Sequence, residues 1–537
     1  MITETLEAAL REALVALAVD PMPDRINLER PASRDHGDWS SNVALASAKR
    51  AGRAPRELAQ QIVDHLGAEL PSGVATVEIA GPGFVNFRLD NSWLHDILED
   101  TVEKGPERFG RSDEGTGKRV IVEFVSANPT GPIHAGHARG ACYGDALARL
   151  FAACGYCVER EFYVNDRGAQ MKTYAVSLLA RKNREEPPDD GYRGDYIIEW
   201  AEHMPDGLTV DEAVEWGYAY AQADQQDVLA QLGIHFDTWF SERSMVESGA
   251  IEASLQDLRD HDVVYEADGA TWLRSTDYGD DKDRVLIRSD GDYTYITPDI
   301  AYHRDKFGRA DHLVDVLGAD HHGYVPRIRA AMQALGHGAS ELDMQITQMV
   351  KLMRGDAEVK LSKRTGELIE LRDIVDEIGA DATRFTYLLQ SIETPQTFDL
   401  ELAASKAMEN PVFYVQMAHA RLRSIQTKAA EAGIDRIALD DVDLALLDHE
   451  RELEVLRRLQ QFPDVLAIAV RERAPHKITN WLREFAAAVH GFYHDCFVMG
   501  DGIEPELTQA RLWLVEAARV GLVAGLGLVG VSAPDSM

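Results

Sequence analysis

The stretch from Glu123 to Gly140, EFVSANPTGPIHAGHARG, decides the fold of this chain. It continues a run rich in β-branched residues, 118–125, that contains neither Gly nor Pro, and such a run predicts a buried strand. The segment NPTGP, residues 128–132, cannot extend the strand, because its two prolines lack a backbone donor and have a fixed φ. Apolar residues then recur at helical spacing as far as Phe151, so we predict a strand, a turn and a helix in succession.

Two histidines fall in the first turn of the predicted helix. The first backbone N–H groups of a helix are unpaired and its dipole is positive there, so we expect an anion to bind. His134 and His137 are three residues apart and share one face, which lets both donate to one phosphate. Gly136 between them lets a flat group approach the backbone. Nucleotide binding is therefore expected, although a pair of surface histidines or two zinc ligands would fit this short pattern too.

These residues resemble the HIGH motif of class I aminoacyl-tRNA synthetases, and the wider run is similar to the arginyl-tRNA synthetase pattern S-x-N-P-T-G-P-x-H-x-G-H-x-R. The resemblance implies that the chain activates L-arginine with ATP and transfers it to the 3'-terminal ribose of tRNA-Arg, releasing AMP and pyrophosphate. It also implies that activation needs bound tRNA. The HIGH region comprises Ala127, Asn128, Pro129, Thr130, Gly131, Pro132, Ile133, His134, Ala135, Gly136 and His137, of which His134, Gly136 and His137 are expected to bind ATP.

A second motif lies far downstream, Lys360-Leu361-Ser362-Lys363-Arg364, and resembles the KMSKS loop of the same class. Three of the 13 lysines fall between residues 351 and 363 of a chain that otherwise favours Arg, which indicates a need for compact ammonium groups. Lysines aimed at a leaving pyrophosphate stabilise the charge that develops there. We expect Lys360, Ser362 and Lys363 to bind ATP, with both lysines and both histidines catalytic. A solvated charge run is the alternative.

An arginine substrate asks for planar carboxylate partners. The resemblance places Glu123 and Asn128 at positions that bind the guanidinium or the amino-acid head, with His134 beside them. It maps Tyr295 and Asp299 onto an arginine-binding Tyr and Asp, and their four-residue separation on one helix turn predicts that both face one pocket. Asp299 following Pro298 also fits a helix N-cap. The last expected contact is His321, in a stretch, 318–322, that departs from relatives with a Gln in this region.

The composition is strongly acidic, with 90 Asp and Glu against 55 Lys and Arg, a net charge of −35 and a pI near 4.9. Such a charge normally argues against a nucleic-acid partner, because phosphates dominate that affinity. An acidic surface with only 13 lysines is, however, what a high-salt cytosol favours, since the Debye length falls to about 3 Å at 1 M salt. We therefore expect a halophilic archaeal source, and net charge then no longer decides the partners.

The compartment expected from the sequence is the cytoplasm. Four cysteines do not make a disulfide framework in 537 residues, and we interpret Cys154 and Cys157 as packing residues rather than a redox pair. The N-terminus is acidic where a signal peptide would be basic. The longest apolar run, 520–531, has 12 residues and four glycines, too short to span a bilayer. We expect a monomer without membrane contacts, with ATP entering as its Mg²⁺ complex and no tightly bound cofactor or metal.

The predicted fold class is multidomain: a Rossmann-like, doubly wound parallel sheet flanked by a small α+β domain and an all-α bundle. The domains expected are 1–112, which by resemblance contacts tRNA; 113–400, the catalytic domain with a helical insertion at about 169–245; and 401–537, the anticodon-binding bundle. Strands are predicted at 157–164, 270–274, 284–287, 312–318 and 345–351.

Two glycine patterns do not indicate nucleotide sites. Residues 525–530, GLGLVG, leave no room for a following helix, so we interpret them as a helix-packing stretch. Residues 115–118, GTGK, lack the other positions of a P-loop. Two alternative functions stay open at this point: a class I synthetase for cysteine or glutamate, and a noncatalytic tRNA-binding paralogue.

Overall fold

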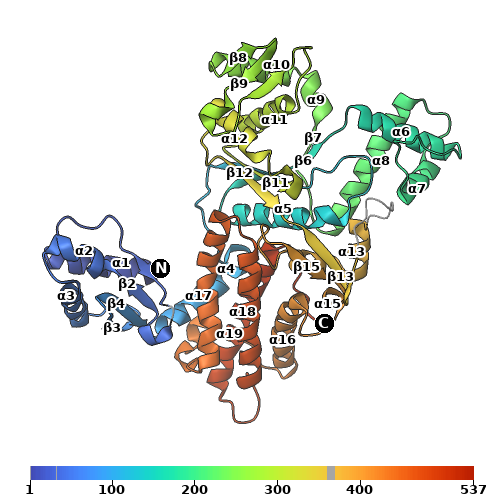
Figure 1. Ribbon diagram of the computed structural model, residues 1–537. Helices are drawn as coiled ribbons and strands as arrows, with labels where there is room; N and C mark the ends of the chain where they lie inside the picture. The colour runs from blue at the N-terminus through green and yellow to red at the C-terminus, as the bar shows by residue number, and fades with distance from the viewer. Residues whose placement is uncertain (1, 32, 360–368) are drawn as a thin grey trace. The chain divides into compact units, whose positions relative to one another are not determined.

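The computed structural model describes residues 2–31, 33–359 and 369–537 (Figure 1). The chain divides into two compact units. The first comprises Met1–Gly105, Ile425–Gln460 and Gly491–Ala518, and the second comprises Pro106–Ser424, Gln461–His490 and Arg519–Met537.

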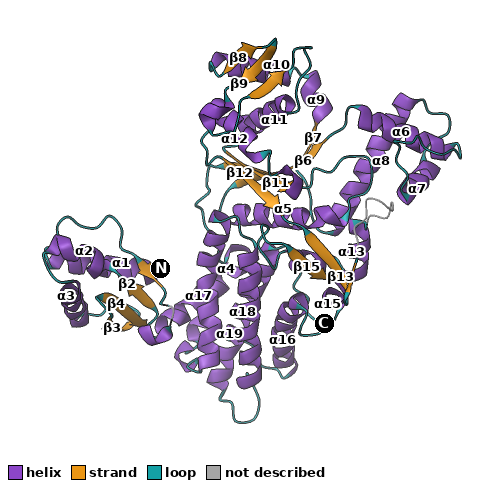
Figure 2. Cartoon of the chain, viewed as in Figure 1, coloured by secondary structure: helices purple, strands orange, loops and turns teal. Residues whose placement is uncertain are grey.

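The N-terminal part of the first unit is a four-stranded antiparallel sheet in the order β1-β2-β4-β3, accompanied by helices (Figure 2). Leu6 and Leu10 of the first helix are fully buried, as are Leu58 and Ile62 of the third, because apolar residues recur on one face of each helix. The α+β character expected of this region is therefore confirmed. The elements are α1 Ile2–Ala16, β1 Leu28–Glu29, β2 Trp39–Ser41, α2 Val43–Ala51, α3 Pro55–Ala68, β3 Val74–Ala80, β4 Phe84–Leu89 and α4 Ser92–Arg108.

The second unit contains a five-stranded parallel sheet in the order β12-β11-β5-β6-β7. From β5 the chain builds outward through β6 and β7, then crosses to the other side of β5 for β11 and β12. The strand order therefore reverses between β5 and β11, and in such sheets ligands bind at that point, beyond the carboxyl ends of the strands. The elements are β5 Arg119–Glu123, α5 Ala135–Ala153, β6 Cys157–Val164, β7 Thr238–Ser241, β11 His312–Gly318 and β12 Leu342–Thr347.

The doubly wound parallel fold is confirmed, with β6 and β11 at the predicted residues, but three details differ. β5 ends at Glu123 because Val125 and Ser126 take left-handed φ values of 70° and 44° and turn the chain away. The predicted strand 345–351 spans a break between two strands of different sheets. Strand β7 lies inside the range 169–245 and pairs with β6, so the helical insertion ends earlier.

The insertion has a hydrophobic core of its own, to which Tyr174, Leu178, Ile197 and Trp200 contribute. It consists of α6 Ala169–Lys182, α7 Asp195–His203 and α8 Val210–Gln231, and it lies beside the sheet-bearing part of the second unit in Figure 1.

Two smaller sheets complete the second unit. The predicted strands 270–274 and 284–287 form an antiparallel sheet, β10-β9-β8, and β14-β13-β15 form another. The elements are α9 Glu242–Glu247, α10 Ala250–Asp260, β8 Val264–Ala267, β9 Ala270–Leu273, β10 Arg284–Ile287, α11 Ile296–Arg309, α12 Val325–Ala334, β13 Val350–Arg354, β14 Ala357–Glu358, α13 Leu371–Ile378, α14 Ala380–Tyr387 and β15 Gln396–Asp399.

After β15 the described chain is helical to its end, as predicted. A Cβ on Gly525 would lie 2.8 Å from Leu482 and 2.9 Å from Trp481, so this glycine allows close helix packing and its stretch is no nucleotide motif. The elements are α15 Leu400–Ala404, α16 Pro411–Glu431, α17 Glu450–Arg471, α18 His476–Asp495 and α19 Pro505–Leu528.

Candidate active site

The two predicted histidines meet at the N-terminus of α5. His134 is the N-cap residue, and its Nδ1 accepts a hydrogen bond of 3.0 Å from the Gly136 amide. Because Nδ1 is the acceptor, the proton of the neutral ring resides on Nε2, which is then a donor. The ring of His137 lies 4.0 Å from that of His134, centroid to centroid. The structure thus brings both imidazoles together at the positive end of a helix dipole.

Gly136 has a different role from the one expected. A Cβ at this position would lie 2.7 Å from Cε1 and 2.8 Å from Nδ1 of the His134 ring. Such contacts are shorter than real Cβ atoms allow, so any larger residue would push the ring out of its capping position. Gly136 is required here by the His134 side chain.

The expectation of unpaired first-turn N–H groups is wrong in this structure. The Ala135 amide donates to the Ile369 carbonyl at 2.9 Å, Gly136 donates to His134 Nδ1, and the His137 amide donates to the His134 carbonyl at 2.9 Å. Sequence reasoning missed these bonds because one acceptor lies more than 230 residues away and another is the histidine itself. An anion at this tip would therefore meet imidazole groups and the helix dipole rather than unpaired backbone N–H groups of residues 135–137.

Residues 369–371 join the same tip. The Leu371 amide donates to the Ile133 carbonyl at 2.8 Å, and His134 and Glu370 form an antiparallel bridge. The second motif comes just before them in sequence, but Lys360, Ser362 and Lys363 lie outside the described residues. The described chain thus resumes, six residues after Lys363, in direct contact with the histidine motif.

Glu370 carries an unusual charge environment. Burial raises its pKa to about 7, helped by the neighbouring carboxylates of Asp373, Asp224 and Glu199, while Arg372 opposes the shift. The carboxyl group is therefore partly protonated near neutral pH. Its residue pairs with His134 through the antiparallel backbone bridge.

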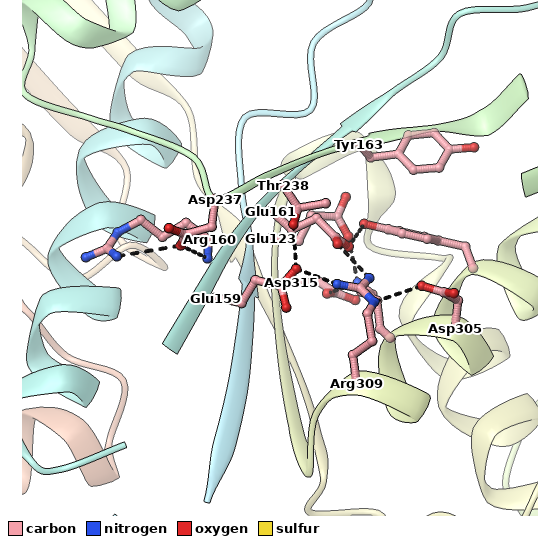
Figure 3. Close-up of polar contacts among 12 residues, drawn as sticks. Glu123, Glu159, Arg160, Glu161, Tyr163, Asp237, Thr238, Asp305, Arg309 and Asp315 are labelled. Carbon is pink, nitrogen blue, oxygen red and sulfur yellow. Dashed lines mark hydrogen bonds and ion pairs between the residues drawn. The ribbon is translucent and has the colours of Figure 1, made fainter. Parts of the chain in front are cut away.

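Glu123, the last residue of β5, belongs to a buried ionic cluster (Figure 3). Its Oε1 accepts from the Ser126 hydroxyl at 2.9 Å, and its Oε2 pairs with Lys306 Nζ at 2.7 Å. Lys306 also pairs with Asp315 of β11 at 2.5 Å, and the Lys306 side chain has no exposed surface. Burial opposes its charge, yet the carboxylates of Asp315 and Glu123 outweigh burial and raise its pKa.

His303 completes this cluster by lying 2.8 Å from the second oxygen of Asp315. Burial alone would raise the pKa of Asp315, but the charges of Lys306 and His303 lower it. Sequence reasoning found Glu123 and missed Lys306, His303 and Asp315. A signal was present, since Lys306 is one of only 13 lysines in an arginine-rich chain.

A second acidic group extends along β6. The Tyr302 hydroxyl donates to Glu161 at 2.6 Å, and Arg309 pairs with Glu159 at 2.5 Å and with Glu161 at 2.6 Å (Figure 3). Glu161 is fully buried. These contacts tie α11 to the sheet and fix the helix that carries Asp299.

Asp299 lies half-buried in the first turn of α11; loss of hydration raises its pKa, while a hydrogen bond from Tyr324 lowers it. The N-cap alternative for Asp299 is wrong, because Tyr295 occupies that position. His321 lies near the same carboxylate: its ring meets the Tyr324 ring edge-on at 6.1 Å, and its charge acts on the pKa of Asp299. Asp299, Tyr324 and His321 thus form one group.

The expectation that Tyr295 and Asp299 face one pocket is not met in this structure. Tyr295 is 88 % exposed, whereas Asp299 is half-buried and accepts a hydrogen bond from Tyr324. Asn128 is also exposed, and its carbonyl accepts from Gln225 at 3.0 Å. Of the residues expected to bind arginine, the structure therefore brings Asp299 and His321 together and leaves Tyr295 and Asn128 at the surface.

The described residues contain no group of three or more His, Cys, Asp or Glu side chains placed to hold a metal ion. None of their helices has the length and apolar character needed to cross a membrane.

Three family models match the chain. Residues 2–89 match the arginyl tRNA synthetase N terminal domain, residues 105–189 and 218–423 match the catalytic domain of tRNA synthetases class I (R), and residues 415–537 match the DALR anticodon binding domain. Together they cover most of the sequence in the order that the resemblance implied.

Whole-chain comparisons agree. The Arginine--tRNA ligase of Shouchella clausii is 44% identical, with 99% of each chain covered, and that of Bacillus cereus is 44% identical, with 100% of this chain and 98% of the relative covered. The solved Thermus thermophilus arginyl-tRNA synthetase superposes with a TM-score of 0.76 over the full length of both chains and, at 23% identity, shows the fold alone. All three are bacterial and give no support to an archaeal source. The chain belongs to the class I arginyl-tRNA synthetases.

Proposed function

We propose that the chain is an arginine–tRNA ligase, which makes arginyl-adenylate from arginine and ATP and then transfers the arginyl group to the terminal ribose of tRNA-Arg. The observation that carries this assignment is 44% identity over the full chain to enzymes of that name. The geometry agrees, since the histidine pair lies at the helix tip following the central strand, where doubly wound sheets bind ligands.

For the activation step, we assign the phosphate contacts to His134, His137, Lys360 and Lys363. His134 supports the assignment because its bond from Gly136 leaves Nε2–H as a donor. The arginine carboxylate attacks the α-phosphorus in line, so the enzyme supplies positioning and charge stabilisation rather than a nucleophile. Mg²⁺ accompanies ATP as part of the substrate.

Proximity in sequence supports the convergence of the two motifs. Lys363 precedes Ile369 by six positions. The Ile369 carbonyl accepts a hydrogen bond from the amide of Ala135, the residue next to His134.

For the arginine substrate, we assign recognition to Glu123, Asn128, Tyr295, Asp299 and His321. Asp299 has the strongest support, because its carboxylate is half-buried and accepts a hydrogen bond from Tyr324. A guanidinium brought beside it would favour the charged carboxylate and reverse the rise in its pKa. Glu123 already binds Lys306 and Ser126. We therefore assign it an electrostatic contribution to arginine binding as well as any direct contact with the substrate.

The activity is tested by ATP–pyrophosphate exchange with arginine, cysteine or glutamate, each in the presence of tRNA. Exchange should appear with arginine and be at background with the other two. Exchange with cysteine or glutamate instead would assign a different class I activity. Binding of tRNA without exchange or charging would indicate the noncatalytic paralogue.

We further propose that the enzyme works as a cytoplasmic monomer adapted to high salt. The support is a net charge of −35 with only 13 lysines, a composition whose self-repulsion is screened by concentrated salt. The melting temperature should rise between 0.1 and 2 M KCl, and exchange activity should persist at 2 M. A melting temperature that falls over this range, or loss of activity, contradicts the proposed adaptation.

A further inference from the structure

The turn that delivers the histidines to their position is held by the helical insertion. Gln225 of α8 is 1 % exposed, and its Nε2 donates to the carbonyl oxygens of Asn128 and Gly131, each at 3.0 Å. Both partners are acceptors, and only the amide NH₂ group offers two donors, which fixes the orientation of the side chain. One buried residue thus spans both ends of the turn that precedes His134.

A second contact reaches the same turn from another helix of the insertion. The Tyr196 hydroxyl of α7 donates to the Thr130 carbonyl at 3.0 Å. A Cβ on Gly131 would lie 3.0 Å from the Tyr196 ring, so the glycine leaves room for it. Three carbonyl oxygens of the turn, those of residues 128, 130 and 131, therefore receive hydrogen bonds from the insertion.

Helix α8, which carries Gln225, also contacts α13. Arg372 pairs with Asp224 at 2.9 Å and with Asp227 at 2.8 Å, one on each side of Gln225 in sequence. At its N-terminus, α13 is bonded through Leu371 to Ile133. Helix α8, the turn and α13 therefore form a closed triangle of contacts around the base of the histidine motif.

We propose that the insertion is a brace for the activation site and that Gln225 is its principal positioning residue. Gln225 acts on the reaction through the 128–131 turn, to which both of these hydrogen bonds go. The inference rests on the proposed function, because its kinetic readout is arginine activation. The brace requires a buried side chain with two hydrogen-bond donors at position 225 and a rigid α8 to hold that side chain against the turn.

The rigidity comes from the core of the insertion, where Tyr174 and Trp200 pack. The Tyr174 hydroxyl donates to the Gly217 carbonyl at 3.3 Å, within the insertion and away from the turn. Tyr174→Phe therefore removes a bond of the same kind, from a side chain to a backbone carbonyl, without touching residues 128–131. It is the matched control for a merely structural effect.

The experiment compares full-length Gln225→Met and Tyr196→Phe with Tyr174→Phe and with Gln226→Met, a change at the exposed neighbour of Gln225. Two quantities are measured: ATP–pyrophosphate exchange kinetics with arginine and tRNA, and amide hydrogen exchange of peptides covering 127–137. Gln225→Met should lower kcat at least tenfold with less than a twofold change in KM for arginine, and should speed hydrogen exchange in 127–137. Tyr196→Phe should act in the same direction, and both controls should match the parent.

The brace is overturned if Gln225→Met and Tyr174→Phe change kcat and hydrogen exchange alike. If Gln225→Met does not fold, Tyr196→Phe decides by the same two readouts. Amide hydrogen exchange also separates the two proposals. If the parent protein does not activate arginine, the proposed function is refuted, but the rate of hydrogen exchange in residues 127–137 of the variants still tests the brace.

Discussion

At the scale of single residues, the site depends on small distances that a sequence pattern does not contain. His134 caps its own helix through Nδ1, and Gly136 leaves the space that the ring needs. The pattern H-x-G-H therefore specifies a tautomer as well as two imidazoles, since the bonded Nδ1 leaves the proton on Nε2.

Gly136→Ala tests this dependence. The added methyl group meets the His134 ring at 2.7 Å and displaces it, so kcat for arginine activation should fall at least tenfold with tRNA binding nearly intact. The control is Gly308→Ala, a helical glycine with nothing within 4 Å of its added Cβ. The control should keep full activity. A Gly136→Ala enzyme with parent kinetics would contradict the role given to the His134 ring.

Lys306→Met tests the buried cluster. Removing the only ammonium between Glu123 and Asp315 in the described network leaves two buried carboxylates without their cation, which costs about 3–5 kcal/mol of unfolding free energy. A large fall in the urea midpoint of the second unit should report it. Lys282→Met, at an exposed lysine, should change stability by no more than about 0.5 kcal/mol. Equal midpoints for both variants would contradict the structural role of the cluster.

At the scale of elements, strands of the parallel sheet could be predicted from the sequence, whereas the contacts that join distant elements could not. Strands β6 and β11 appear at their predicted residues because both are rich in β-branched, aromatic or other apolar residues and contain no proline. The early end of β5 was missed because Val125 carries a left-handed φ that its side chain disfavours. The bonds from α8 and α13 to the histidine turn were missed because they join residues far apart in sequence.

The pH dependence of stability belongs to this scale, because Glu370 sits where α13 meets the histidine turn. Its pKa is about 7 in the fold against 4.5 ordinarily, so the folded state keeps a proton that the unfolded chain releases. Stability should therefore fall as pH rises from about 4.5 to about 7 and then level off. Since the group is only half buried, we expect an effect of no more than about 2 kcal/mol.

Glu370→Gln removes this titration while keeping a side-chain acceptor for the helix cap. The difference in melting temperature between pH 5 and pH 8 should be smaller in this variant than in the parent. Glu401→Gln, at an exposed glutamate, should leave the parent profile unchanged. An identical profile for Glu370→Gln would show that the Glu370 carboxyl is not responsible.

At the scale of the whole molecule, motif and composition gave different kinds of information. Two short motifs and the order of three family regions were sufficient to identify the enzyme family. The positions of the expected arginine-binding residues were harder to predict. Tyr295 and Asp299 share a helical spacing, but Tyr295 is exposed and Asp299 is half-buried, and exposure follows from tertiary packing. Lys306 and Gln225 were missed for the same reason: their roles exist only when distant elements meet.

The central claim is that His134 and Lys363 act on one triphosphate. The measurement that tests it most directly is a double-mutant cycle of His134→Ala and Lys363→Ala in arginine-dependent ATP–pyrophosphate exchange with tRNA present. Each single variant should lower the activation rate at least tenfold while tRNA binding stays nearly intact, because the lost contact belongs to the transition state. The double variant should lose much less than the product of the two single losses. Losses that multiply would contradict a shared triphosphate, and parent kinetics in Lys363→Ala would remove that lysine from the mechanism.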